Sequence, residues 1–207
     1  MYPKSYLLLF LAYFPFLLFS QNIRFGLKGG LNLSRDKFEL YSQGIPLNLN
    51  TEVAASYHFG GLMEFYLEDS RTVLQMEFLY TGNGMLIREN ELSKRKRFNL
   101  TQITIPLVFK FEAKEDLYFN GGTYFGRILT AQELNSLGQT SNIKDRFQLF
   151  DLGFLLGFEF KVNQRLSFDL RYNYGLLNFN NADAYEGSET ERLYKNRTVN
   201  YGMVYKF

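Results

Sequence analysis

Eight stretches of this chain alternate apolar and polar side chains, and the links between them are short and long in turn. Because successive residues of a β-strand point to opposite faces, this period of two predicts strands with one apolar and one polar face. The expected strands are 22–33, 56–68, 72–83, 98–113, 117–129, 148–162, 166–174 and 194–207. The short links are 69–71, 114–116 and 163–165, and the long links are 34–55, 84–97, 130–146 and 178–193.

The length of these strands separates two possible barrels. A soluble antiparallel sheet turns its apolar face inward, whereas a membrane barrel turns it toward lipid. All of these strands except 166–174 are twelve to sixteen residues long, and a tilted strand needs about 9–11 to cross a bilayer. Tyr and Phe residues gather near the strand ends, as in the aromatic girdles of outer-membrane barrels. The sequence therefore predicts an all-β fold: an eight-stranded antiparallel up-and-down transmembrane barrel with short periplasmic turns and long external loops.

The first residues have the layout of a secretory signal. Lys4 precedes an apolar run from Tyr6 to Phe19, and Ser20 is a small residue at a cleavage point before Gln21. The run contains Pro15 and is shorter than the roughly 20 residues of a membrane-spanning helix. We expect a signal peptide over 1–20, a barrel domain over 21–207 and location in the cell outer membrane.

Composition excludes several kinds of chemistry. The chain has no cysteine, so it has no disulfide, no thiolate metal site and no lipoprotein anchor. The formal charge of +2 is too small to indicate a nucleic-acid partner. No cofactor and no metal site are expected, since a single histidine without cysteines leaves mainly carboxylates as ligands.

The polar face of the strands is rich in charge. Eight strands leave a lumen about wide enough for side chains to fill. The expected inward-facing charges are Arg24, Lys28, Lys110, Arg171, Glu64, Glu77, Asp151, Glu159 and Asp169. Because buried charges need partners, these residues predict an ion-pair network that plugs the barrel and sets strand register. Pro106 cannot donate to a strand ladder, so a local bulge is expected there.

Several short motifs occur in the order and spacing of one family. They are Phe25-Gly26-Leu27-Lys28-Gly29-Gly30-Leu31-Asn32, Ile103-Thr104-Ile105-Pro106-Leu107, Asp151-Leu152-Gly153 and Arg171-Tyr172-Asn173-Tyr174-Gly175-Leu176. With them, residues 21–207 resemble the PorT-like family of small outer-membrane β-barrel proteins. The terminal Tyr205-Lys206-Phe207 resembles the signal read by the barrel-insertion machinery. The resemblance implies an eight-stranded barrel, with one namesake branch tied to gliding motility and protein secretion.

No catalytic residue is predicted. His58, with Glu64 nearby in sequence, could belong to a Ser-His-acid set, but its expected place in the lumen argues against action on lipid. The basic run Lys94-Arg95-Lys96-Arg97 could bind lipopolysaccharide phosphate, or form a solvated loop face. The stretch Asn180-Asn181-Ala182-Asp183 fits a polar external loop.

Three functions remain open at this point. The first is a non-enzymatic scaffold whose external loops bind a partner, such as an envelope or secretion-system protein. The second is a lipid-modifying outer-membrane enzyme. The third is a soluble periplasmic barrel whose apolar faces line a ligand pocket.

Overall fold

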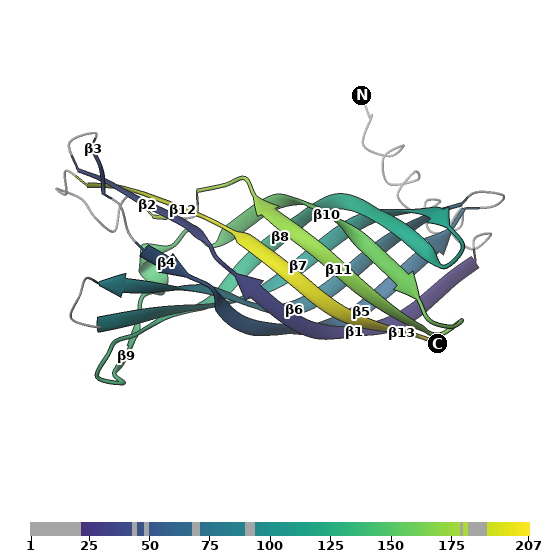
Figure 1. Cartoon of the computed structure of the whole chain (residues 1–207), viewed down its shortest axis with the longest axis horizontal. Helices are drawn as coiled ribbons and strands as arrows, with labels where there is room; N and C mark the ends of the chain where they lie inside the picture. The colour runs from purple at the N-terminus through teal and green to yellow at the C-terminus, as the bar shows by residue number, and fades with distance from the viewer. Residues whose placement is uncertain are drawn as a thin grey trace, which may run out of the picture.

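The fold is a closed antiparallel barrel of eight long strands (Figure 1). The computed structural model describes residues 22–42, 45–47, 50–67, 71–89, 94–178, 180–181 and 190–207, so the predicted signal at 1–20 lies outside the described residues. The barrel strands are β1 (Asn22–Ser34), β5 (Ala54–Tyr66), β6 (Thr72–Glu89), β7 (Lys94–Lys114), β8 (Leu117–Leu134), β10 (Phe150–Lys161), β11 (Leu166–Gly175) and β13 (Arg197–Lys206). Each pairs with its neighbours in chain order, and β1–β13 pairing completes the circle. The predicted fold class is confirmed.

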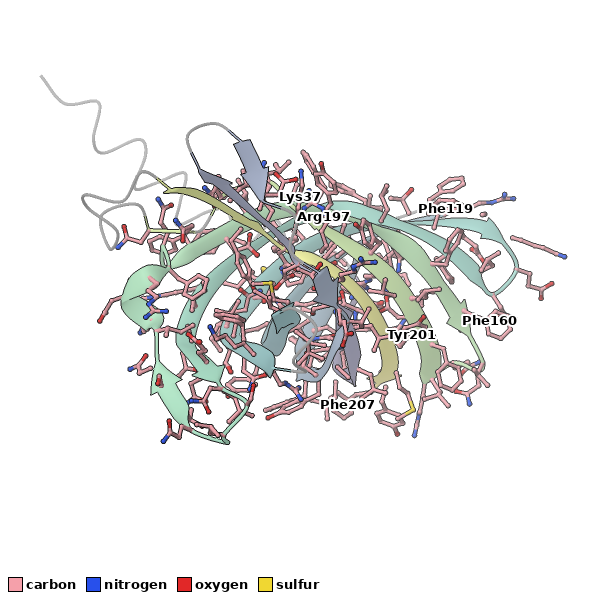
Figure 2. All side chains as sticks on the ribbon, turned by 60° about the vertical axis from the view of Figure 1, so that its left-hand side comes forward. Lys37, Phe119, Phe160, Arg197, Tyr201 and Phe207 are labelled. Carbon is pink, nitrogen blue, oxygen red and sulfur yellow. The ribbon has the colours of Figure 1, made fainter. Side chains whose placement is uncertain are left out.

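The barrel is apolar outside and polar inside. Strand β10 shows this most regularly: its side chains are alternately exposed and buried along the whole strand. Leu156 is 65% exposed, whereas Asp151 and Glu159 are 1% and 0% exposed. Figure 2 shows Phe119, Phe160 and Tyr201 on the outer surface of the ribbon. An outward apolar face suits a barrel surrounded by lipid, so the third alternative, a soluble barrel whose apolar faces line a pocket, is wrong.

One end of the barrel carries the short turns and the C-terminus, and the other carries an extension (Figure 1). We call these the turn end and the cap end. The predicted long link 84–97 is wrong, because β6 and β7 stay paired from Thr72–Phe111 to Glu89–Lys94. The strands beyond the membrane-spanning part continue because paired strands satisfy the backbone donors and acceptors that a loop would leave to water.

The other long links also contain short strands. They are β2 (Lys37–Ser42), β3 (Ile45–Leu47), β4 (Asn50–Glu52), β9 (Thr140–Asn142) and β12 (Thr190–Lys195), with a 3₁₀ turn η1 (Lys144–Arg146). β2, β3 and β12 form a separate three-stranded sheet, whereas β4 pairs with β6 and β9 with β8. No helix among the described residues is long and apolar enough to cross a bilayer.

The extension has an apolar core of its own. It contains Met85, Ile87, Leu100, Ile128, Ala131, Ile143, Phe147 and Tyr194, with Phe98 packed against it. Along β6 the inward face therefore changes from Gln75 and Glu77 inside the barrel to Met85 and Ile87 above it. We call this folded part, 83–89, 94–101 and 128–147 with β2, β3, β4 and β12, the cap. It buries apolar side chains away from water, as a soluble domain does.

Pro106 is accommodated without a bulge. On the β6 side, the ladder has the same register before and after Pro106, at Met76–Leu107 and Leu79–Thr104. On the β8 side, Pro106 pairs with Tyr124 in the regular β7–β8 register. The register shifts lie instead between Thr101 and Gln102 and between Glu112 and Lys114. The predicted bulge at Pro106 is wrong, because losing one N–H interrupts a ladder without requiring an extra residue.

Candidate functional site

The lumen is filled by polar and charged side chains from all eight barrel strands. They alternate with the outward apolar residues, so the strand pleat alone directs them inward. The buried set includes Lys28, Asn32, His58, Glu64, Gln75, Glu77, Gln102, Thr104, Lys110, Asn120, Asp151, Glu159, Ser167, Asp169, Arg171, Thr198, Asn200 and Lys206. Because the outward residues face lipid, these groups find their partners inside the lumen, on the same strand or on other strands.

Four charges nearest the turn end form a closed ring of alternating sign. Lys110 Nζ lies 2.6 Å from Glu64 Oε1 and also contacts Glu159. Lys206 Nζ lies 2.9 Å from both Glu64 Oε1 and Glu159 Oε1. The four side chains come from β7, β5, β10 and β13, and the two cations balance the two anions. We call this set the turn-end ring.

A second ring of alternating charge lies next to it along the lumen. Lys28 Nζ is 2.7 Å from Asp169 Oδ1 and 3.5 Å from Glu77 Oε1. Arg171 Nη1 is 2.7 Å from the same Glu77 oxygen, and Arg171 Nε is 2.5 Å from Asp169 Oδ2. These side chains come from β1, β6 and β11, and their charges also cancel. We call this set the middle ring; the two rings place no net charge in the lumen.

His58 lies beside the middle ring and is 3% exposed. Its Nδ1 is 2.7 Å from Asn32 Oδ1, and its Nε2 has no hydrogen-bond partner among the described residues. No serine hydroxyl therefore contacts this imidazole within that part of the chain, and the ring does not face lipid. The described residues also contain no group of three metal-ligating side chains.

Above the rings the lumen becomes less charged. Val108, Tyr124 and Leu155 pack together as a small apolar layer. The Tyr124 hydroxyl lies 3.2 Å from Asp151 Oδ2, and Asn196 Nδ2 donates to that same oxygen at 3.0 Å. Asp151 is therefore held by hydrogen bonds and belongs to neither ring.

A buried carboxyl joins the barrel to the cap. Asp36 follows β1, and its Oδ1 and Oδ2 accept hydrogen bonds from the Arg197 backbone N–H at 3.0 Å and the Tyr194 hydroxyl at 2.9 Å. Burial raises the pKa of Asp36 to about 7, although both hydrogen bonds act in the opposite direction. Burial, and then the charge of Asp36, raise the pKa of Tyr194 well above its usual value. Tyr194 therefore stays a neutral donor.

Most of the predicted lumen charges are confirmed. Lys28, Lys110 and Arg171 are buried inside, as are all five predicted carboxylates. Arg24 is a wrong prediction: it has the inward parity, but it lies at the turn end, where it is exposed and its guanidinium stacks 4.9 Å from the Tyr66 ring centroid. Sequence reasoning missed Lys206, although its place between the outward Tyr205 and Phe207 was a sufficient signal.

The basic run lies in the cap, and residues 180–181 of the other candidate segment contact it. The basic run 94–97 is not a loop but the first residues of β7, where Arg97 Nη2 donates to the carbonyl of Ala55 at 2.9 Å. Asn180 forms an isolated bridge with Phe147, and Asn181 Nδ2 donates to the carbonyl of Asp145 at 3.0 Å. Residues 182–183 lie outside the described residues.

Comparison with known proteins found several that are similar to this chain. The chain is similar to neisserial surface protein A, with a TM-score of 0.55 and 15% identity over 88% of this chain and 97% of that one, which shows the shared fold. It is also similar to Ail of Yersinia pestis (TM-score 0.45, 16% identity, 89% and 98% covered) and to the outer-membrane protease OmpT of Escherichia coli (TM-score 0.43, 9% identity, 89% and 96% covered). No curated protein sequence matches. A family model, "Outer membrane protein beta-barrel domain", matches residues 19–181. The chain thus belongs to this family of outer-membrane β-barrel proteins and lies in the outer membrane.

Proposed function

We propose that this protein is a non-enzymatic scaffold: a barrel with a closed lumen that presents its cap to a partner in the cell envelope. The observation that carries this is the pair of neutral charge rings below a separately packed cap. The ion-paired side chains occupy the lumen, and an apolar core of its own holds the cap together. Binding surfaces are often displayed in this way on a rigid scaffold.

The surroundings of His58 favour a scaffold over a lipid-modifying enzyme. Its imidazole lies in the lumen against Asn32, away from the lipid that such an enzyme must reach. Nucleophilic catalysis needs a base within hydrogen-bond reach of its nucleophile. His58→Ala should accordingly leave the lipid A profile of an overexpressing strain unchanged, and an altered profile in the wild-type strain alone would favour the enzyme.

The PorT-like resemblance of residues 21–207 suggests the kind of partner. One branch of that family is tied to secretion and gliding motility, so an envelope or secretion-system protein is the partner we propose. The terminal Tyr205-Lys206-Phe207 is proposed as the contact with the barrel-insertion machinery. A shared fold is weak support for a shared function, so the cap itself has to be tested.

Site-specific photo-crosslinking in outer membranes tests the cap. Leu137 lies in a cap turn and is 83% exposed, which makes it a suitable crosslinker position. The matched control is Gln164 in the exposed turn after β10. We expect a defined protein adduct from position 137 and none from 164. Equal labelling at both positions, or no adduct at 137, would count against the scaffold role.

A shortened hairpin gives a second, independent test. Replacing 88–95 with Asn-Gly joins Ile87 to Lys96 through a two-residue turn that hairpins favour, and keeps Ile87 in the cap core. This variant should lose the position-137 adduct or reduce its yield, while the barrel still shows heat-modifiable mobility on a gel. An unchanged yield would place the partner elsewhere.

Conductance tests the closed lumen. The wild-type protein in a planar bilayer should show no large, stable channel steps. A large and lasting conductance would show that the rings do not close the lumen, and the scaffold proposal would give way to transport.

A further inference from the structure

Two pairs of like charge lie where β1 and β13 leave the barrel. The backbone N–H of Arg35 donates to the Arg197 carbonyl at 2.9 Å, and Lys37 pairs with Lys195 in the β2–β12 register. Asp36 and Asn196, which separate the two pairs, are buried inside. All four cations therefore share the outward face, and Figure 2 shows Lys37 and Arg197 close together there. We call these four residues the basic patch.

Among the described residues, few anionic groups on the outward face balance the basic patch, although the buried Asp36 carboxyl lies behind Arg197. Like charges directly opposite each other destabilise a strand pair. Among the described residues, the only ion pair of the patch joins Lys37 Nζ to Glu39 Oε1 at 2.9 Å. Arg197 Nη1 donates to the carbonyls of Gly175 and Asn196, which carry no charge. An anion from outside the chain would remove this repulsion.

The position of the patch indicates where that anion comes from. The outward residues at the end of β1 are Leu31 and Leu33, which are 62% and 37% exposed, and the next outward residues along the chain are Arg35 and, at the start of β2, Lys37. The apolar face from Ile23 to Leu33 has about the length that crosses a bilayer. The basic patch thus begins where the lipid-facing surface ends, at the cap end of the barrel, which is the level of the outer-leaflet headgroups.

An apolar groove begins under the patch. The Arg197 guanidinium carbon lies 3.5 Å from the ring centroid of Tyr174. Tyr174 in turn borders a groove of about 620 Å³ on the lipid-facing side of β7, β8, β10 and β11. Its wall includes Tyr172, Phe109, Phe154 and Leu156, and at Gly121 no side chain fills it. The groove and the basic patch therefore meet at Tyr174.

We propose that the basic patch and this groove together bind a phosphorylated lipid of the outer leaflet. Its phosphate lies on Arg35, Lys37, Lys195 and Arg197, and an acyl chain lies in the groove at Gly121. A cation cluster attracts anionic headgroups with roughly five-fold tighter binding for each Lys or Arg near the surface. A soluble polyanion would contact the same cations but would gain nothing from the groove.

The test measures lipid binding to the full-length barrel in a zwitterionic detergent by native mass spectrometry. The probes are phosphorylated lipid A, the same lipid after dephosphorylation, and a heparin oligosaccharide as a soluble polyanion. The patch variant is Arg35→Gln/Lys195→Gln, which spares the stacked Arg197. Its charge-matched control is Lys114→Gln/Lys144→Gln, which removes one exposed cation at the turn end and one half-buried cation in the cap.

We expect the patch variant to bind phosphorylated lipid A roughly 25-fold more weakly, since two cations are lost. The control variant should bind phosphorylated lipid A as tightly as the wild type does. The patch variant should bind the dephosphorylated lipid as tightly as the wild type does. Equal binding of both lipids, or an equal loss in the control, would overturn the proposal. Tighter binding of heparin than of lipid A would assign the patch to a soluble polyanion and would overturn it too.

The groove is tested separately. A Cβ added at Gly121 meets Leu156 Cδ2 at 3.5 Å, an ordinary contact, so Gly121→Leu fills the groove without moving the backbone. We expect this variant to bind phosphorylated lipid A several-fold more weakly and heparin no differently. Ala113→Leu, also exposed on the outer surface, is the control. Unchanged lipid binding by Gly121→Leu would refute the acyl-chain part.

Unfolding temperature tests the like-charge argument itself. Without lipid, Lys195→Gln should unfold at the same temperature as the wild type or a higher one, because a repulsive pair is gone. With phosphorylated lipid A the order should reverse, since only the wild type gains full stabilisation from the ligand. A lower unfolding temperature of Lys195→Gln without lipid would show that the cations stabilise the fold, and would contradict the proposed repulsion between them.

Discussion

Lys206 Nζ lies 2.9 Å from Glu64 Oε1, so the penultimate residue of the chain is ion-paired with a strand two positions away around the barrel. Lys206 also contacts Glu159 on β10, on the other side of β13. The turn-end ring can therefore be complete only when β13 has paired with β1 and closed the barrel. This makes the ring a check on closure and register.

Lys206→Met should destabilise the barrel by about 3–5 kcal/mol, because it leaves two buried carboxylates with Lys110 as their only cation. The temperature at which the folded form loses its gel mobility shift measures this. Lys161→Met, at the half-exposed turn end, should change little. Adding Glu159→Gln to Lys206→Met should restore part of the loss by leaving one neutral pair; fully additive losses would contradict the ring.

Phe78→Arg should destabilise the barrel in a lipid bilayer by about 2–4 kcal/mol, because Phe78 is 59% exposed on the outward face and a cation there meets hydrocarbon. Denaturant unfolding in vesicles measures the change. Leu137→Arg introduces the same charge but lies in the cap, so it should leave the free energy of unfolding unchanged. If both substitutions were tolerated alike, the outward face of β6 would not be in lipid.

Met85→Ala should loosen the cap and leave the barrel folded. Met85 is fully buried in the cap core, and such truncations cost about 2–5 kcal/mol. In limited proteolysis, the protease should then cleave the cap of Met85→Ala faster than that of the wild type, while the barrel stays protected. Leu137→Ala should be cleaved at the same rate as the wild type. Loss of barrel folding in Met85→Ala would show that cap and barrel are one cooperative unit.

The junction at Asp36 should depend on pH. Its pKa is about 7 in the folded protein against 3.8 as the ordinary value, so the folded state holds the proton more tightly. Stability of the junction therefore falls as pH rises from about 4 to about 7, by up to about 4 kcal/mol, and is level above that range. Hydrogen exchange of 35–42, corrected for its intrinsic rate, measures this.

Asp36→Asn is the matched variant for that measurement. It keeps the size and an acceptor oxygen for Tyr194 but cannot titrate, so protection of 35–42 should no longer change between pH 5 and 8. Protection that still falls over this range in the variant would assign the pH dependence to another group.

The strand pleat made much of the lumen predictable. Residues such as Lys28 and Asp169 had to point inward once Leu27 and Leu170 pointed outward, because side chains alternate. The cap was harder to predict from the sequence, since Met85 and Ile87 continue the inward face of β6 through residues that look like a charged link. The charged residues of 84–97 suggested a loop, but most of this segment forms paired strands of β6 and β7.

Alternation along the chain by itself determined the eight-stranded barrel, its inverted faces and most of the lumen charges, because these follow from a local period of two. Only the tertiary structure decided which charges meet. Lys206 and Glu64 are 142 residues apart in sequence and come together through barrel closure. The same holds for Arg35 beside Arg197, since strand register is set by the whole closed sheet.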